Sequence, residues 1–199
     1  MSDDEKRHQT SIKNGGTMVL ETGKYYHFYD RSNNNEIIFK EDRNYLFFLE
    51  HYKQYMEQYV STIAYCLMPT HFHFLIKVTT TNIAPLKINI AALLSGYTKT
   101  LNKSFDRHGS LFQPHSKAKE IDDLSYLLTV MSYIHQNPLR AGLAKHIGDW
   151  KYSSYPALAG LQQESFIDQN FIREHFPSTE AFKKYSEEIV PLIKYKYWI

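Results

Sequence analysis

The segment from Val60 to Val78 constrains the fold of this chain more than any other. It reads VSTIAYCLMPTHFHFLIKV, in which two runs rich in β-branched, aromatic and other apolar residues flank Pro69 and Thr70. Such runs favour strands, and the Pro-containing break between them predicts a turn or bulge. Two strands joined so closely pair in the antiparallel sense. The chain is therefore expected to contain an antiparallel sheet that includes this hairpin.

Further elements are predicted on both sides of the hairpin. The aromatic-rich residues 24–32 predict a strand, and NNNEIIF at 33–39 predicts a turn followed by a short strand. Apolar residues at helical spacing predict helices over 41–58 and 84–105. Gly109 opens a short extended segment. A last long helix is expected from a cap at Asp122 or Asp123 to about Asn137, where Pro138 stops or kinks it.

Hairpins alternating with helices indicate an α+β domain, a ferredoxin-like antiparallel sheet with helices packed on it. The 199 residues are enough for one domain with a full core, and 43% of them are hydrophobic, which indicates a globular chain. We expect a disordered leader over residues 1–20, the main domain over 21–160 and a C-terminal helical extension over 161–199.

Several classes are excluded by what the sequence lacks. No apolar run approaches the roughly 20 residues of a membrane helix, and the N-terminus has no apolar segment typical of a signal peptide. Cys66 is the single cysteine, so an intrachain disulfide and a thiolate zinc cluster are excluded. A cytoplasmic protein is the natural interpretation.

His71 and His73 are unusual in a segment built for burial. Side chains of a strand alternate between faces, so Phe72, Phe74 and Ile76 share one face and the two histidines lie side by side on the other. Neighbouring imidazoles can bind a divalent metal. They can equally be two unrelated polar residues that form hydrogen bonds at the edge of the core.

The predicted helix at 122–137 carries a second pair of candidates. Tyr133 falls roughly 150° from the centre of the stripe formed by Leu124, Leu127, Leu128, Met131 and Ile134. Asn137 projects from the same side one turn later. A phenol is a competent nucleophile towards phosphorus, and an amide oxygen suits magnesium or manganese. The structural alternatives are an ordinary interface tyrosine and an N-cap before Pro138.

Charge is unevenly distributed, although the whole chain carries only +2. Residues 97–119 contain five lysines and arginines against the single acid Asp106, a local charge of +4. This is the pattern of a solvated face or of a phosphate-binding surface. The cations that could contact phosphate are Lys99, Lys103, Arg107, Lys117 and Arg140, and Tyr97 is an aromatic residue in the basic stretch.

Five stretches carry a resemblance to a known family. In order, they read AYCLMPTHFHFLIKV, YTKTLNKSF, GSLFQPHSK, YIHQNPLRAGL and DWKYSSYPAL. They resemble the single-tyrosine HUH transposases of bacterial insertion sequences, in particular the REP-associated tyrosine transposases. The likeness spans about Lys24 to Leu158. The His-hydrophobic-His triplet alone is a weak motif, but the triplet after LMP followed by YIHQNPLRAG is specific.

The resemblance implies a role for each candidate. His71 and His73 match the paired metal ligands, and Tyr133 matches the nucleophile. Asn137 matches the polar third ligand, with Gln136 as a substitute. A divalent Mg or Mn ion, a homodimer, and single-stranded or hairpin DNA follow as cofactor and partners. The five cations then become candidate DNA contacts, and Tyr97 a candidate aromatic for stacking on a base. Gln113, His115 and Lys117 depart from the Arg-rich stretch of relatives, and the tail beyond Leu158 has no counterpart that we can match.

The implied reaction is cleavage and rejoining of single-stranded DNA. Tyr133 attacks a phosphate next to the metal and becomes linked to the 5′-phosphate, and a second 3′-hydroxyl reverses the step. Three alternatives stay open: a domesticated protein that binds hairpin DNA without cutting it, a phosphodiesterase that uses water, and a structural α+β protein without metal. Whether the tyrosine acts within its own chain is also open.

Overall fold

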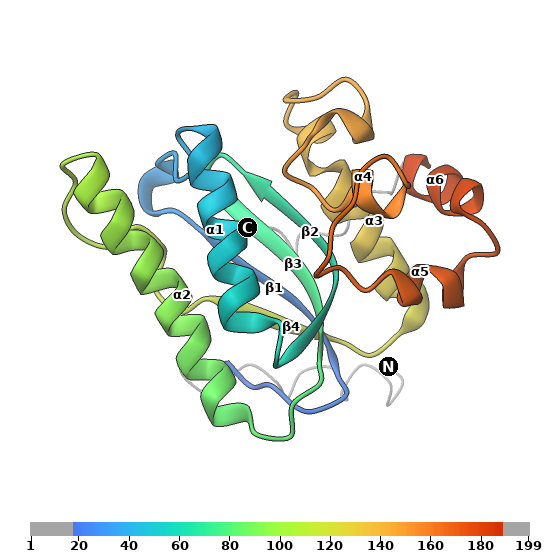
Figure 1. Ribbon diagram of the computed structural model, residues 1–199, viewed down its shortest axis with the longest axis horizontal. Helices are drawn as coiled ribbons and strands as arrows, with labels where there is room; N and C mark the ends of the chain where they lie inside the picture. Colours follow the sequence, from blue (N-terminus) through green and yellow to red (C-terminus); the bar gives the residue numbers. More distant parts are fainter. Residues whose placement is uncertain (1–17, 189–199) are drawn as a thin grey trace, which may run out of the picture.

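The computed structural model describes residues 18–188, so the leader predicted over 1–20 lies almost entirely outside the described residues. Within them, four strands form one antiparallel sheet (Figure 1). In chain order they are β1 (Tyr25–Arg31), β2 (Val60–Met68), β3 (His71–Val78) and β4 (Lys117–Ile121). The order across the sheet is β2-β3-β1-β4, which places β1 and β3 at the centre.

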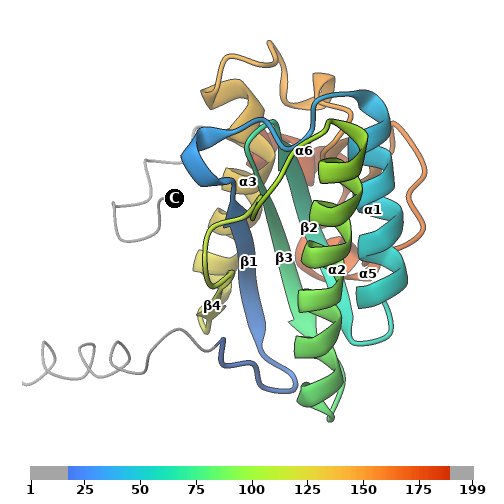
Figure 2. The same ribbon diagram turned by 90° about the vertical axis from the view of Figure 1, so that its left-hand side faces the viewer.

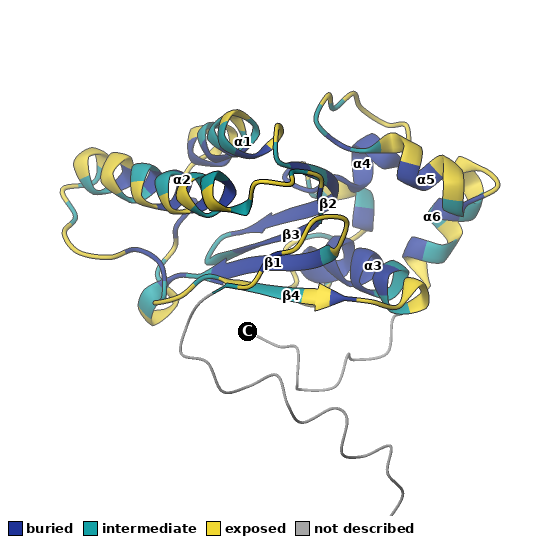
Figure 3. Cartoon of the chain, turned by 90° about the horizontal axis from the view of Figure 1, so that it is seen from below, coloured by how far each residue is buried: buried dark blue, intermediate teal, exposed yellow. Residues whose placement is uncertain are grey.

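Helices cover both faces of this sheet. α1 (Asp42–Met56) and α2 (Ile83–Ser104) pack on one face, and α3 (Leu124–Arg140) packs on the other (Figures 2 and 3). The succession β1-α1-β2-β3-α2-β4 is the ferredoxin-like arrangement, and the predicted α+β class is confirmed. No helix in the described part of the chain is long and apolar enough to cross a membrane.

Short helices follow α3. They are α4 (Tyr155–Leu158), α5 (Gln169–His175) and α6 (Thr179–Glu187), preceded by a 3-10 turn at Ile147–Asp149. Another 3-10 turn, Asn33–Asn35, lies between β1 and α1. α6 contacts α3, so α3 is enclosed between the sheet and the C-terminal segment. The extension predicted over 161–199 therefore contains α5 and α6 as far as it is described.

An aromatic core fills the space between the sheet and the helices α1 and α2. The Tyr52 ring stacks on Phe74 of β3 with 3.8 Å between centroids, and Phe48 contacts both Phe72 and Phe74. These residues occupy the face of β3 that the alternation predicted. The histidines of β3 consequently point to the opposite face, towards α3.

Two local predictions are wrong in part. Residues 33–39 form a 3-10 turn and a loop instead of a short strand, because Asn34 and Asn35 both take positive φ values of 53° and 55°. Asparagine tolerates this left-handed conformation, which reverses the chain. Pro138 does not end α3, which continues to Arg140. The expected cap at Asp123 is confirmed, since its carboxylate accepts a hydrogen bond from the Tyr126 N–H.

Buried histidines make this fold sensitive to acid. His27, His73 and His135 are all buried. Burial lowers the pKa of His27 and His135 from 6.5 to about 3, and that of His73 well below 6.5. Below pH 6.5 the unfolded chain takes up protons that the folded chain does not. The contribution of these histidines to the free energy of unfolding is therefore complete above pH 6.5 and is lost as the pH falls towards 3.

His135→Gln tests this pH dependence away from the candidate site. Glutamine can retain a hydrogen bond to the Ser154 hydroxyl, which lies 2.9 Å from His135 Nε2, and it does not titrate. Between about pH 7.5 and pH 5, the unfolding free energy of the variant should fall by about 2 kcal/mol less than that of the wild type. Denaturant titrations at both pH values measure this difference. Equal losses in the two proteins would contradict the explanation.

Candidate functional site

The pairing of β1 with β3 determines which side chains surround the two histidines. His73 lies opposite Tyr29, and His71 lies opposite Arg31. Residues directly opposite in an antiparallel pair point to the same face. The face under α3 therefore carries Arg31 and Tyr29 together with both histidines.

A cavity of about 170 Å³ lies where this face meets the C-terminal end of α3. It unites the two halves of the predicted site, since the strand histidines and the helix tyrosine line it together. The Tyr133 and His73 rings meet edge-on with 6.0 Å between their centroids. One chain supplies both halves. The lining residues are Arg31, Met68, His71, His73, Tyr133, Asn137, Arg140 and Ala141.

Both histidines of the pair are held in the neutral form. Burial lowers the pKa of His71 to about 4 and that of His73 well below its usual value. His71 Nδ1 lies 3.0 Å from the Thr70 hydroxyl, which leaves Nε2 to bind a ligand. His73 is 1% exposed, and its buried Nε2 has no hydrogen-bond partner among the described residues. An orphaned imidazole nitrogen in a cavity fits a metal ligand.

His27, which sequence reasoning missed, is the hydrogen-bond partner of His73. Its Nε2 lies 2.9 Å from His73 Nδ1, and the two rings stack. For His73 Nε2 to present a lone pair, its Nδ1 must carry the proton and donate it to His27. His27 and Arg31 lie on the same face of β1. Only the register between β1 and β3 shows that His27 reaches His73.

The ring nitrogens of His71 and His73 can hold a metal ion only together with further ligands. Residues 18–188 contain no group of three or more His, Cys, Asp or Glu side chains that could hold a metal ion. A cation bound by His71 and His73 therefore requires other oxygen donors, from an amide, water or substrate phosphate. Magnesium and manganese characteristically accept such ligands.

Tyr133 is buried, with 6% exposure, although its helical position lies off the predicted apolar stripe. That stripe was partly wrong, since Leu124 is 50% exposed. The helix is enclosed on two sides, so residues from Val130 to Pro138 are buried on every face. Burial raises the pKa of Tyr133, while Arg140, Arg31 and a side-chain hydrogen bond with Asn137 lower it. The phenol is protonated at neutral pH, with two guanidinium groups close enough to stabilise negative charge.

Asn137 has a structural role as well as a place in the cavity. Pro138 has no N–H to donate to the Ile134 carbonyl. The Asn137 Nδ2 donates to that carbonyl at 3.4 Å and to the Tyr133 carbonyl at 2.9 Å, which helps the helix to continue past the proline. The Asn137 Oδ1 is the atom that can serve a metal.

Gln136, the substitute ligand, lies outside the cavity. Its Nε2 donates to the carbonyls of Ser186 and Glu188 at 2.8 and 2.7 Å, and its Oε1 accepts from Arg140. The side chain therefore anchors the C-terminal segment instead of entering the cavity, whose lining does not include it.

Two predicted DNA contacts occupy structural positions. Tyr97 is 1% exposed, and its hydroxyl donates to the Ile38 carbonyl at 2.6 Å, so this ring cannot stack on a base. Arg107 pairs with both carboxylate oxygens of Glu36 at 2.5 and 2.7 Å and also donates to the Asn102 side chain. Its guanidinium holds the turn after α2.

The remaining cations lie on two sides of the molecule. Lys99 and Lys103 are exposed on α2, on the sheet face opposite Tyr133. Lys117 is exposed on β4 and lies 5.8 Å from the Tyr29 ring, on the face of the histidines. Arg140 lines the cavity, 5.9 Å from the Tyr133 ring. Lys117 and Arg140 are thus the predicted contacts nearest to the site.

A ferredoxin-like sheet with paired histidines on a central strand, facing a tyrosine from a packed helix, defines a candidate metal and phosphate site. No family model matches the chain. The chain is 31% identical over 114 residues to a Haemophilus influenzae protein named as a REP-associated tyrosine transposase. The match covers 52% of this chain and 64% of that protein, just under two thirds of the relative's length.

A solved structure shows the same fold. It is that of a REP-associated tyrosine transposase bound to a REP hairpin, with a TM-score of 0.59 and 14% identity. The superposition covers 75% of this chain and 94% of the other. The sequence match agrees with the resemblance that the motifs indicated, and the structural match confirms the fold.

His27→Leu should weaken binding of Mn²⁺ by about 10- to 100-fold, because His73 loses the acceptor that fixes its tautomer. His27→Gln retains an acceptor oxygen and should bind Mn²⁺ more tightly than the leucine variant. Electron paramagnetic resonance of free Mn²⁺ measures both affinities without requiring activity. His71→Ala removes a proposed metal ligand, so this variant shows the Mn²⁺ affinity expected when the site is destroyed. A His27→Leu protein that is folded and binds Mn²⁺ like the wild type would refute the role.

Proposed function

We propose that this protein is a transposase-like endonuclease that cleaves and rejoins single-stranded DNA through Tyr133. One observation carries the proposal: His71, His73 and Tyr133 line a single cavity in one chain. The names of the two similar proteins, a REP-associated tyrosine transposase and one bound to a REP hairpin, support DNA as the substrate.

His71, His73 and the Asn137 Oδ1 are the groups that would hold a divalent Mg or Mn ion. Neutral imidazoles and an amide oxygen leave the positive charge of the cation largely uncompensated. When bound, the cation supplies Lewis-acid polarisation of the scissile phosphate. His27 and Thr70 hold the two imidazoles in place through the opposite ring nitrogens.

The protein's own groups supply the rest of the reaction. As the phenolic oxygen of Tyr133 bonds to phosphorus, the bond from phosphorus to the 3′-oxygen breaks. The phenol proton is lost and a proton ends on the released 3′-hydroxyl, which leaves a 5′-phosphotyrosine. Attack by another 3′-hydroxyl reverses these steps and joins a new strand. Arg31 and Arg140 neutralise charge on the phosphate and on the phenolic oxygen.

The cavity favours a single strand or a hairpin over a continuous duplex. Tyr133 sits between α3 and the sheet with little exposure, so a phosphate must enter a narrow space to meet it. A duplex phosphate is harder to bring in line there. Lys117 and Arg140 are placed to contact the backbone next to the site, and Lys99 and Lys103 to contact more distant nucleotides.

Tyr133→Phe should lose the covalent protein–DNA adduct and retain hairpin binding, because only the nucleophilic oxygen is removed. The protein is incubated with labelled hairpin-bearing strands and Mg²⁺ or Mn²⁺. A denaturing gel then measures the amount of covalent adduct. Tyr97→Phe is the matched control, since it removes a buried hydroxyl of the core and should keep the adduct. Excess chelator should abolish wild-type cleavage.

The same gel decides between this proposal and the principal alternative, a protein that binds hairpin DNA without cutting it. Hairpin binding by a folded wild-type protein that forms no adduct with any strand would favour the alternative. An adduct that peptide mapping places on a tyrosine other than Tyr133 would refute the assigned nucleophile.

We also propose a homodimer, on the family resemblance alone. Since one chain carries the whole cavity, dimerisation is not required to complete the site. Sedimentation of the full chain at micromolar concentration should show a dimer. A monomer that retains full adduct formation would remove the case for it.

A further inference from the structure

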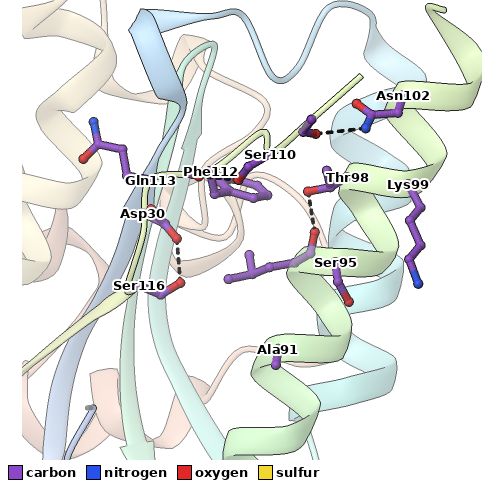
Figure 4. Close-up of a pocket in the computed structure, with 12 residues that line it drawn as sticks. Asp30, Ala91, Ser95, Thr98, Lys99, Asn102, Ser110, Phe112, Gln113 and Ser116 are labelled. Carbon is purple, nitrogen blue, oxygen red and sulfur yellow. Dashed lines mark hydrogen bonds between the residues drawn. The ribbon is translucent and has the colours of Figure 1, made fainter. Parts of the chain in front are cut away.

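A second cavity, which the proposed reaction does not use, lies on the other face of the sheet. It measures about 440 Å³, a size typical of small-ligand pockets, and lies between α2 and the segment 109–116 (Figure 4). Ser95 and Thr98 of α2 form one wall, and Phe112 and Ser116 form the other. Asp30, from the end of β1, lies beside Ser116 on the side away from α2.

Asp30 is a buried acid whose hydrogen-bonding capacity is only partly used. It is 5% exposed and accepts hydrogen bonds from the Ser116 hydroxyl at 2.5 Å and the Arg31 N–H at 2.8 Å. An ionised carboxylate offers about four acceptor positions. None of the ion pairs within residues 18–188 involves Asp30. A ligand with N–H donors would therefore compensate a carboxylate that is costly to bury.

The surroundings of Asp30 differ from one end of the cavity to the other. Phe112 provides an apolar aromatic wall, whereas Lys99 lies at the edge with its ammonium group in solvent (Figure 4). Lys103 is exposed one turn further along α2. This arrangement fits a flat ring with N–H donors inside the cavity and an anionic group outside it, which are the two ends of a nucleotide.

We propose that this cavity binds one unpaired base of the DNA strand, and that it prefers guanine. The inference rests on the proposed DNA substrate. Guanine presents two adjacent donors, N1–H and the 2-amino group, which match the two oxygens of Asp30. Adenine and cytosine place an acceptor nitrogen beside their amino group, and thymine flanks its single N–H with carbonyls, so each brings a lone pair towards the carboxylate.

The end of β1 connects this cavity with the Tyr133 cavity. Asp30 and Arg31 are consecutive and point to opposite faces, and Arg31 lines the Tyr133 cavity. The Arg31 carbonyl also accepts from the N–H of Gln113, which lines the second cavity. A strand that crosses this edge of the sheet can reach both cavities. A base held near Asp30 would then select the phosphate that meets Tyr133.

The test uses the full chain and fluorescein-labelled hairpin oligonucleotides. Each oligonucleotide carries a single-stranded thymidine extension that contains one guanine, and the position of the guanine differs from one oligonucleotide to the next. At the position that gives the tightest binding, hypoxanthine then replaces guanine. Hypoxanthine lacks the 2-amino donor, so wild-type affinity should fall about tenfold. Asp30→Asn keeps the shape of the side chain but turns one acceptor into a donor. This variant should bind both strands alike and still form the Tyr133 adduct.

A second pair of variants tests the cavity without altering Asp30. Ser95→Leu fills the space from the α2 wall and should also remove the preference for guanine. Thr100→Leu, an exposed position of the same helix outside the cavity lining, should retain it. Melting temperatures establish that each variant is folded.

The inference fails if no guanine position improves wild-type binding. It also fails if Ser95→Leu and a folded Asp30→Asn discriminate the two strands as the wild type does. Both failures are compatible with a Tyr133 adduct. Absence of the adduct together with a guanine preference that depends on Asp30 would instead refute only the cleavage function.

Discussion

The register between β1 and β3 is the constraint on which the rest of this structure depends. It sets His73 opposite Tyr29 and His71 opposite Arg31, and it brings His27 within hydrogen-bonding distance of His73. A slip of one residue would turn the histidines into the aromatic core and the phenylalanines towards α3. Burial of Phe72 and Phe74 under α1 therefore also orients the imidazoles. The core and the site are two faces of the same two strands.

The helix α3 completes the candidate site by adding its own side chains to those of β1 and β3. It is buried from Val130 to Pro138 between the sheet and α6, so Tyr133 is fixed by packing on both sides. The Asn137 side chain helps this helix to continue past Pro138 and thereby carries Arg140 to the rim of the cavity. A nucleophile held this rigidly needs little reorganisation to meet a positioned phosphate.

Periodicity predicted the elements well because the strands and long helices bury clear apolar patterns. Spacing marked His71, His73, Tyr133 and Asn137 only as candidates, and the family resemblance gave them roles. The fold brings the four residues together. The errors arose where tertiary contacts decide: Tyr97 and Arg107 looked like surface residues but satisfy core and loop partners. Gln136 was indistinguishable in sequence from a ligand. His27 and Arg31 were missed because strand register is not encoded in any local pattern.

The central claim is that a single chain contains a complete site, and mixing two inactive variants tests it most directly. One variant carries His71→Ala and His73→Ala, and the other carries Tyr133→Phe, with tags of different mass. Incubated together with a labelled hairpin strand and Mn²⁺, they should form no covalent adduct, because each chain lacks half of its own cavity. Wild-type protein mixed with either variant serves as the positive control. An adduct with the mass of the histidine variant would show that Tyr133 works in another chain's site and would contradict the account.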